Sequence, residues 1–222
     1  AEFVKSSGLN ANILAPLTTG LISYYKLDGD STDSLAVNNG TDTGITYSGA
    51  NGVINSGAGF DGSTSFINLG STASLNLTGA MSFFAWAKNT STANYRMILT
   101  RGPSGGATYE FRFEITTGRL VLIAGASSFN SGFAPTLGSW HHVGFTRTSG
   151  NVVVVYSDGV QVGTTTLGAA PSLPATSTFI GKRADGFFML GAIDEAGIWN
   201  RALDPQEAIS LYNGGAGVQY PF

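Results

Sequence analysis

The sequence predicts an all-β fold, an antiparallel β-sandwich with one short C-terminal helix. Three observations support this class. Short segments rich in β-branched and aromatic residues alternate with Gly, Asn, Asp and Ser along nearly the whole chain. The 222 residues include 31 Gly, and only 11% are charged, against a usual share of roughly 25%. Hydrophobic residues make up 42%, with 14 Phe and 8 Tyr, which is enough material for a sizeable core.

Eleven segments have the composition and length of strands. Asp158-Gly159 stands between two of them, and this dipeptide is a strong signal for a tight hairpin. Gly118 marks a second hairpin in the same way. Many short strands with regular turn signals favour a sandwich. The predicted strands are 21–27, 65–70, 81–88, 96–102, 108–115, 119–125, 140–147, 151–157, 160–166, 177–183 and 191–199.

One helix is predicted over residues 204–213. Asp204 stands at the N-cap, Pro205 at the first helical position and Glu207 three residues after the cap, which is an Asp version of the capping box. Gly214 is expected to end the helix. Apolar residues follow at helical spacing, at Ala208, Ile209, Leu211 and Tyr212.

The domain is expected to span residues 21–222, with residues 1–20 as an N-terminal tail or linker. Several classes are disfavoured by composition. The net charge of −3 and the lack of a basic stripe argue against nucleic acid as a partner. No apolar run approaches the roughly 18 residues of a membrane helix. The absence of cysteine excludes disulfides and thiolate metal sites, and favours a bacterial or phage source over a secreted eukaryotic one.

Four segments together resemble laminin-G-like domains of the concanavalin A-like lectin/glucanase superfamily, over roughly residues 20–215. The resemblance implies a jelly-roll sandwich with one concave sheet. It implies less about function, because such domains bind sugars, bind proteins or act as spacers. The segments are "LISYYKLDGDSTDSLAVNNGT", "GFDGSTSFINLG" with "LNLTGAMSFFAWAK", "GSWHHVGFTR" with "VVYSDGVQVG", and "GAIDEAGIWNRALDPQEAISLYNGG".

Catalysis by paired carboxylates is disfavoured. Glu110 and Glu114 share one strand face with Arg112, but four residues along a strand span roughly 13 Å. Glycosidases need their two carboxyls about 5–9.5 Å apart. The three residues are better interpreted as a charge ladder or a row that contacts sugar. The Glu-x-Asp-x-x-Glu pattern associated with the glucanase branch is absent.

Neighbouring residues on a strand point to opposite faces, which bears on two adjacent pairs. Asp194 and Glu195 should therefore have different roles, with Glu195 next to backbone amides or a base such as Arg201. His141 and His142 should likewise diverge, which leaves structural roles as the default and no histidine metal cluster.

A structural Ca²⁺ site is predicted at the start of the chain. Three closely spaced acids around a glycine, Asp28, Asp30 and Asp33, offer hard oxygen ligands, although Asx-turns are an equally simple explanation. The resemblance implies that Asp194 of the closing strand joins them.

A ligand surface is predicted from aromatic and charged residues. Strand 81–88 is apolar on both faces, so Trp86 is either packed beneath a loop or part of a binding platform. The loop 182–190 combines a basic pair, an acid and two aromatic rings. The candidate binding residues are Trp86, Arg96, Tyr109, Arg112, Arg183, Asp185 and Phe187.

The sequence therefore favours a non-catalytic carbohydrate-binding module with a glycan partner, from a secreted bacterial protein, a cell surface or a virion. The alternative is a structural or protein-interaction domain of a larger parent protein or phage fibre without a sugar site. An active glycan hydrolase or lyase is the least favoured reading.

Overall fold

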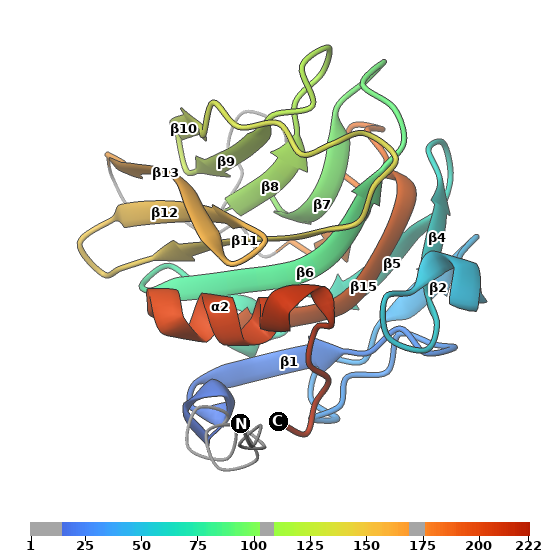
Figure 1. The fold of residues 1–222 in the computed structure, drawn as a ribbon, viewed down its shortest axis with the longest axis horizontal. Coiled ribbons are helices and arrows are strands. Elements are labelled where there is room, and N and C mark those ends of the chain that lie inside the picture. The colour runs from blue at the N-terminus through green and yellow to red at the C-terminus, as the bar shows by residue number, and fades with distance from the viewer. Residues whose placement is uncertain (1–14, 103–108, 169–175) are drawn as a thin grey trace, which may run out of the picture.

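The computed structural model describes residues 15–102, 109–168 and 176–222, and its fold is the predicted antiparallel β-sandwich with one C-terminal helix. Two sheets pack face to face, and helix α2 (Pro205–Tyr212) crosses the outer face of one of them (Figure 1). All strand pairs in both sheets are antiparallel, as expected for a β-sandwich whose strands are joined by hairpins and longer loops.

The first sheet has eight strands. Strand β1 (Leu21–Tyr25) pairs with β15 (Leu190–Trp199), which also pairs with β4 and β6. The remaining order runs β13 (Val160–Thr166), β12 (Val152–Ser157), β11 (His141–Arg147), β6 (Met81–Asn89), β15, β4 (Gly57–Asp61) and β3 (Thr46–Ser48).

The second sheet has seven strands, and its outer face carries the residues discussed below. The order runs β10 (Ser127–Asn130), β9 (Leu120–Ala124), β8 (Tyr109–Phe113), β7 (Arg96–Arg101), β14 (Thr178–Ile180), β5 (Phe66–Gly70) and β2 (Thr41–Thr43). Short 3-10 turns lie at Ala15–Thr18, Gly49–Asn51, Ala73–Leu75 and Asn213–Gly215.

The main core lies between the sheets and follows from the two-residue period of strands. On β8, Tyr109, Phe111 and Phe113 enter this core, so Glu110 and Arg112 face outward. The outward face of the first sheet is also covered. Phe84 and Trp199 pack there with residues of β1 and α2 in a second hydrophobic cluster.

Strand β15 changes partner halfway along one of its edges. Residues Leu190–Ile193 pair with β4, whereas Ala196–Trp199 pair with β1. On its other edge β15 pairs with β6, and the register shifts between Asp194 and Gly197. A β-bulge therefore lies in β15 at the point where its pairing passes from β4 to β1.

Helix α2 begins with the predicted capping box. The Asp204 carboxylate accepts the Glu207 N–H, and the Glu207 carboxylate accepts the Asp204 N–H. The helix ends at Tyr212, because Asn213 adopts a left-handed conformation with φ of 48°.

Residues 15–20 belong to the packed structure, which moves the start of the ordered domain ahead of residue 21. The Leu17 side chain is fully buried, and its carbonyl accepts the Trp199 Nε1–H at 2.7 Å. Residues 1–14 of the predicted tail lie outside the described residues.

All eleven predicted segments contain a strand, and four further strands were not predicted. Strands β2 and β3 are short, polar and largely exposed, and β10 is also mostly polar and half exposed. Strand β4 begins Gly-Ala-Gly, which lacks the β-branched signal. Within the described residues, no helix is long and apolar enough to cross a membrane.

Candidate functional site

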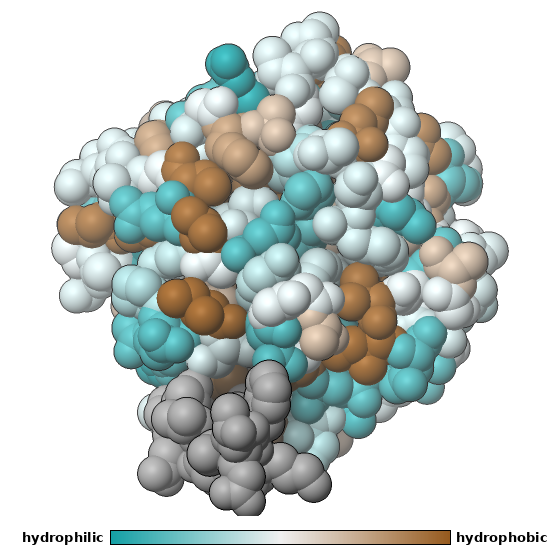
Figure 2. All heavy atoms as spheres, in the orientation of Figure 1, coloured by the Kyte–Doolittle hydropathy of each residue, from teal (hydrophilic) through white to brown (hydrophobic). Residues whose placement is uncertain are grey.

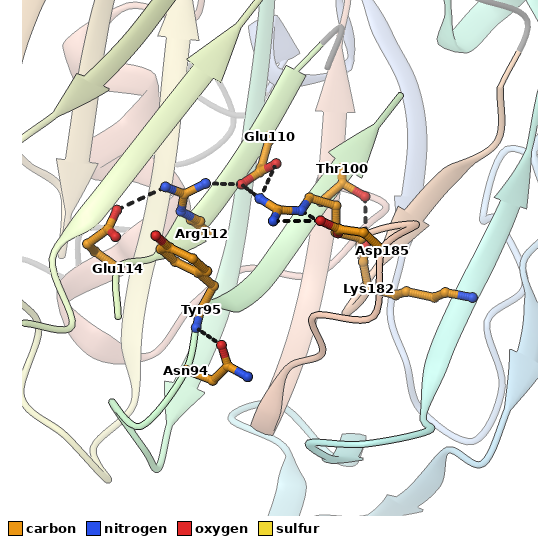
Figure 3. Close-up of polar contacts among 9 residues, drawn as sticks. Asn94, Tyr95, Thr100, Glu110, Arg112, Glu114, Lys182 and Asp185 are labelled. Atoms are coloured by element: carbon orange, nitrogen blue, oxygen red, sulfur yellow. Dashed lines mark hydrogen bonds and ion pairs between the residues drawn. The ribbon is translucent and has the colours of Figure 1, made fainter. Parts of the chain in front are cut away.

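The outer face of the second sheet carries an arginine-carboxylate row. Arg112 on β8 bonds to the carboxylates of both Glu110 and Glu114, the latter through Nη2 at 3.0 Å. This confirms the predicted charge ladder (Figure 3). Glu110 is only 1% exposed, so its charge is compensated by partners rather than by water.

A second arginine completes the pairing of Glu110. The Nη1 atom of Arg183 lies 3.0 Å from Glu110 Oε1, while its Nε and Nη2 form a two-point pair with Asp185 at 2.6 and 3.0 Å. Burial opposes the arginine charge, but Asp185 and Glu110 outweigh it and raise the pKa of Arg183. Such two-point pairs fix the guanidinium plane.

Two aromatic rings lie against these guanidinium groups. The Arg112 guanidinium lies 4.3 Å from the Tyr95 ring centre, and that of Arg183 lies 4.5 Å from the Phe187 ring centre. Tyr95 and Phe187 meet edge to face at 5.2 Å. We call the group Tyr95, Glu110, Arg112, Arg183, Asp185 and Phe187 the arginine platform.

The loop that supplies half of the platform is closed by backbone hydrogen bonds. Arg183 N–H donates to the Phe187 carbonyl at 2.9 Å, and residues 182 and 188 form a β-bridge. Arg96 fixes the loop from outside, since its Nη1 donates to the Phe188 carbonyl at 3.3 Å. The platform is therefore held in one geometry before any ligand arrives.

A lysine and two phenylalanines extend the outer face toward β5. The Lys182 ammonium lies 4.0 Å from the Phe66 ring centre and 5.3 Å from that of Phe179. The two rings meet edge to face at 5.8 Å. Thr100 Oγ1 donates to the Lys182 carbonyl at 2.5 Å, which fixes the base of this side chain (Figure 3).

The structure brings together five of the seven predicted binding residues, namely Arg96, Arg112, Arg183, Asp185 and Phe187, in or beside the platform. Tyr109 is not on this surface. It is 1% exposed within the core, and its hydroxyl donates to the Leu75 carbonyl at 3.2 Å. Strand alternation explains the difference, because Tyr109 and Arg112 are an odd number of residues apart.

Trp86 lies on the other sheet, so it shares no surface with the platform. It is 3% exposed and packs against His142 and Tyr212, with ring centres 5.3 and 5.7 Å away. Most of the Trp86 side chain is therefore packed inside the protein, which is one of the two interpretations that the sequence offered for strand 81–88.

The first-loop aspartates act mainly on backbone amides. Asp33 is 1% exposed and accepts four backbone N–H groups, from Tyr24, Leu35, Val37 and Asn38. Asp30 accepts the N–H of Thr32, which is an Asx-turn. Asp28 accepts the N–H of Ser56 and the side-chain amides of Asn55 and Gln219.

Asp194 and Glu195 do not face apart, which corrects the prediction from strand alternation. Glu195 has φ of 51° in the bulge of β15, and this extra residue turns its side chain to the same outer face as Asp194. Asp194 accepts the N–H groups of Val53 and Ile54 at 2.8 and 3.0 Å.

Glu195 binds the C-terminal segment and β1 rather than Arg201. It accepts the Tyr24 hydroxyl and the Gln219 amide, each at 2.6 Å, whereas Arg201 pairs with Glu207. Burial, reinforced by the neighbouring acids, raises the pKa of Asp194 to about 7 and that of Glu195 to about 8.

Calcium binding stays a prediction. Across the described ranges, no three His, Asp or Glu side chains are arranged to hold a metal ion. The oxygens of Asp33 and Asp194 face N–H donors, which occupy the lone pairs that a cation needs. As they stand, the four aspartates do not fit a shared Ca²⁺ ion.

The two histidines diverge as expected. His142 is buried and stacked on Phe84 at 5.6 Å, and burial lowers its pKa to about 3. His141 accepts the Thr136 N–H through Nε2 and lies 2.7 Å from Asp158 through Nδ1.

Sequence reasoning missed Tyr95, Phe66 and Phe179. Tyr95 lies in a loop with no strand period. Phe66 alternates with the buried Ile67 and Leu69, so its outward position was readable, but only the pairing of β5 with β14 brings it to Phe179.

The sequence of this chain matches the model of one protein family. Residues 61–208 match the family model Laminin_G_3, described as the concanavalin A-like lectin/glucanases superfamily. The search of curated proteins finds no match.

Solved structures share the fold at low identity. Domain 4 of an extracellular GH43 arabinanase from Geobacillus stearothermophilus, in complex with arabinotriose, is 22% identical, with a TM-score of 0.65 over 85% of this chain and 96% of that domain. Trypanosoma rangeli sialidase with sialic acid is 16% identical (TM-score 0.70), over 91% of this chain and 34% of the sialidase. A structure of botulinum neurotoxin type C, a toxin whose cell entry depends on interaction with two ganglioside molecules, is 14% identical (TM-score 0.68), over 94% of this chain and 53% of that chain. The chain thus spans only a third to a half of the larger proteins, and these likenesses establish the fold.

Proposed function

We propose that this chain, which belongs to the Laminin_G_3 family of the concanavalin A-like lectin/glucanases superfamily, is a non-catalytic carbohydrate-binding module. The observation that carries the proposal is the arginine platform. It places two aromatic rings, two guanidinium groups and the carboxylate of Asp185, whose side chain is 37% exposed, on one sheet face.

The chemistry of the platform suits a glycan. The partly exposed rings of Tyr95 and Phe187 offer flat apolar faces to sugar C–H groups, and the exposed carboxylate of Asp185 can accept a hydroxyl proton in a charge-assisted hydrogen bond. The arabinanase domain in complex with arabinotriose and the botulinum neurotoxin structure have the same fold, which supports the proposal without identifying the ligand. We place the module outside the cell, as part of a larger secreted, cell-surface or virion protein.

The same contacts favour binding over hydrolysis. Arg112 bonds to both Glu110 and Glu114, so neither carboxyl is left as an unpaired acid beside an open site. The two acids with raised pKa values, Asp194 and Glu195, lie on the other sheet, where hydrogen bonds tie them to residues 53–54, β1 and the C-terminal segment.

A glycan array that includes arabinan oligosaccharides and sialosides, followed by calorimetry on each hit, tests the proposal. Phe187→Ala removes a half-buried ring of the platform and should weaken binding about tenfold or more, ~1.4 kcal/mol. Phe133→Ala is the matched control, because it removes a ring that is 37% exposed on a different loop.

The proposal fails if no glycan binds at millimolar concentration, which would favour a structural or protein-interaction domain. It also fails if Phe187→Ala and Phe133→Ala bind a hit as tightly as the unmodified chain. The glycans that bind on the array identify the class of ligand.

A further inference from the structure

A hollow of about 330 Å³ lies on the outer face of the first sheet, on the opposite side of the sandwich from the arginine platform. Its lining residues are Val53, Trp86, Trp140, Asp158, Tyr212 and Gly215, and we call it the Trp pocket. The volume lies at the small end of the range for small-molecule sites, roughly 300–1,000 Å³.

The pocket is assembled from separate parts of the chain. Trp86 comes from β6, Trp140 precedes β11, Asp158 is in the β12–β13 turn and Tyr212 ends α2. The face that carries α2 and this hairpin shows small, separate apolar areas among polar ones (Figure 2). The two Trp residues therefore line a local hollow, not a broad apolar interface.

The two Trp side chains of the pocket differ in exposure. Trp86 is 3% exposed and fixed by its contacts with Tyr212 and His142. Trp140 is half-buried, and the Lys88 ammonium lies 5.0 Å from its ring centre. One ring is thus a rigid wall, while the other has an accessible surface next to a bound cation of the chain itself.

Asp158 supplies a fixed acceptor. The N–H of Thr136 donates to Nε2 of His141, so the ring proton is on Nδ1 and donates to Asp158 Oδ2 at 2.7 Å. The N–H of His142 donates to Oδ1 at 2.9 Å. Burial opposes the charge, but these bonds outweigh it and lower the pKa of Asp158, so the carboxylate is ionised at neutral pH.

This set of groups selects a class of ligand. A flat apolar face can stack on the accessible ring of Trp140, and a ligand hydroxyl can donate to the free lone pairs of Asp158. The Lys88 ammonium and the Asp158 carboxylate carry opposite charges, so the surroundings of the pocket have no net charge that would favour a cation or an anion. We propose that the Trp pocket is a second binding site, which takes one neutral sugar ring.

The inference extends the proposed function but stands on a different sheet and different residues, so either site can fail alone. Tryptophan fluorescence separates them. The chain has three Trp residues, and Trp199 is fully buried with its Nε1–H bonded to the Leu17 carbonyl. The arginine platform contains no Trp, so a change in emission on titration reports the Trp pocket.

The probes are D-glucose, D-galactose and L-arabinose as neutral sugars, with choline as a cation and D-glucuronate as an anion. At least one neutral sugar should change the emission with saturation, and choline and glucuronate should not. Trp140→Ala should abolish the response, and Phe187→Ala in the platform should retain it. Asp158→Asn should weaken the response about tenfold, because Asn tolerates the left-handed φ of 53° but lacks the charge.

Three results would overturn the proposal. The first is a flat emission with all neutral sugars, and the second is a saturable response to choline instead. The third is an unchanged response in Trp140→Ala, provided that its thermal melt shows a folded protein. Loss of glycan binding in Phe187→Ala with the Trp response intact would leave this site standing and confirm that the two are independent.

Discussion

At the scale of single residues, Asp194 and Glu195 show how one backbone torsion changes the role of a side chain. The left-handed conformation of Glu195 turns both carboxylates to one outer face, where they bind three other parts of the chain. Their burial has a measurable consequence for stability.

We expect the unmodified chain to melt at a lower temperature at about pH 9 than at about pH 7. Folded pKa values of about 7 and 8 lie above the ordinary values of 3.8 and 4.5. The folded state therefore holds protons that the unfolded chain has released, and this stability is lost as pH rises through the folded pKa values. The buried His142, with a folded pKa of about 3, affects stability only below about 6.5. Thermal melts in EDTA measure the effect.

Glu195→Gln is the control for this pH dependence. The glutamine amide can donate to the Tyr24 hydroxyl, which still donates to the Val218 carbonyl at 2.9 Å. The fall between pH 7 and 9 should become shallower in this variant. A melting temperature that stays level or rises over this interval in the unmodified chain would contradict the account.

The calcium prediction can also be tested at the scale of single residues. Because N–H donors hold Asp33 and Asp194, we expect the melting temperature at neutral pH to be the same in EDTA and in millimolar CaCl₂. A clear rise in CaCl₂ would establish the calcium site that the sequence suggests, with a rearranged donor set.

At the scale of elements, the capping box of α2 contributes to the free energy of unfolding. Asp204→Ala removes the acceptor of the Glu207 N–H and should lower the free energy of unfolding by about 0.5–2 kcal/mol. Asp204→Ser keeps an acceptor and should lose much less. Urea denaturation compares the two, and equal midpoints for Asp204→Ala and the unmodified chain would exclude this role.

The close pairing of β15 with β6 depends on Gly191. A Cβ atom there would lie 1.8 Å from the Lys88 carbonyl oxygen, on a backbone with φ of 135°. Gly191→Ala should therefore lower the free energy of unfolding by about 2 kcal/mol or more. Gly79→Ala is the matched control, since nothing lies within 4 Å of its Cβ. Similar urea midpoints for the two variants would refute this packing.

Strands whose own sequence shows a clear two-residue alternation were predictable. Strands that form only because a neighbouring strand pairs with them were not. The eleven predicted strands carry β-branched and aromatic residues, and the helix carries its capping residues. Strands β2 and β3 are too short and polar to be recognised without β5 and β4 beside them. The bulge in β15 lies where its pairing passes from β4 to β1, and the local sequence of β15 does not encode that change of partner.

At the scale of the whole molecule, the sandwich has two unlike outer faces. One carries the arginine platform, and the other carries α2, the C-terminal segment and the Trp pocket. The sequence named most of the platform because Arg112 and the loop 182–188 carry unusual charges for this chain. The sequence did not separate Tyr109 and Trp86 from this group, because assigning a face requires strand parity and assigning a sheet requires the topology.

The most direct test of the central claim is to map where an array-selected glycan binds. Two-dimensional NMR of ¹⁵N-labelled chain observes the Nε–H signals of Arg112 and Arg183, together with the backbone amides of residues 94–96 and 182–188. The account predicts that these signals shift with saturation as the glycan is added. A glycan that binds the chain while all of these signals stay in place would contradict it.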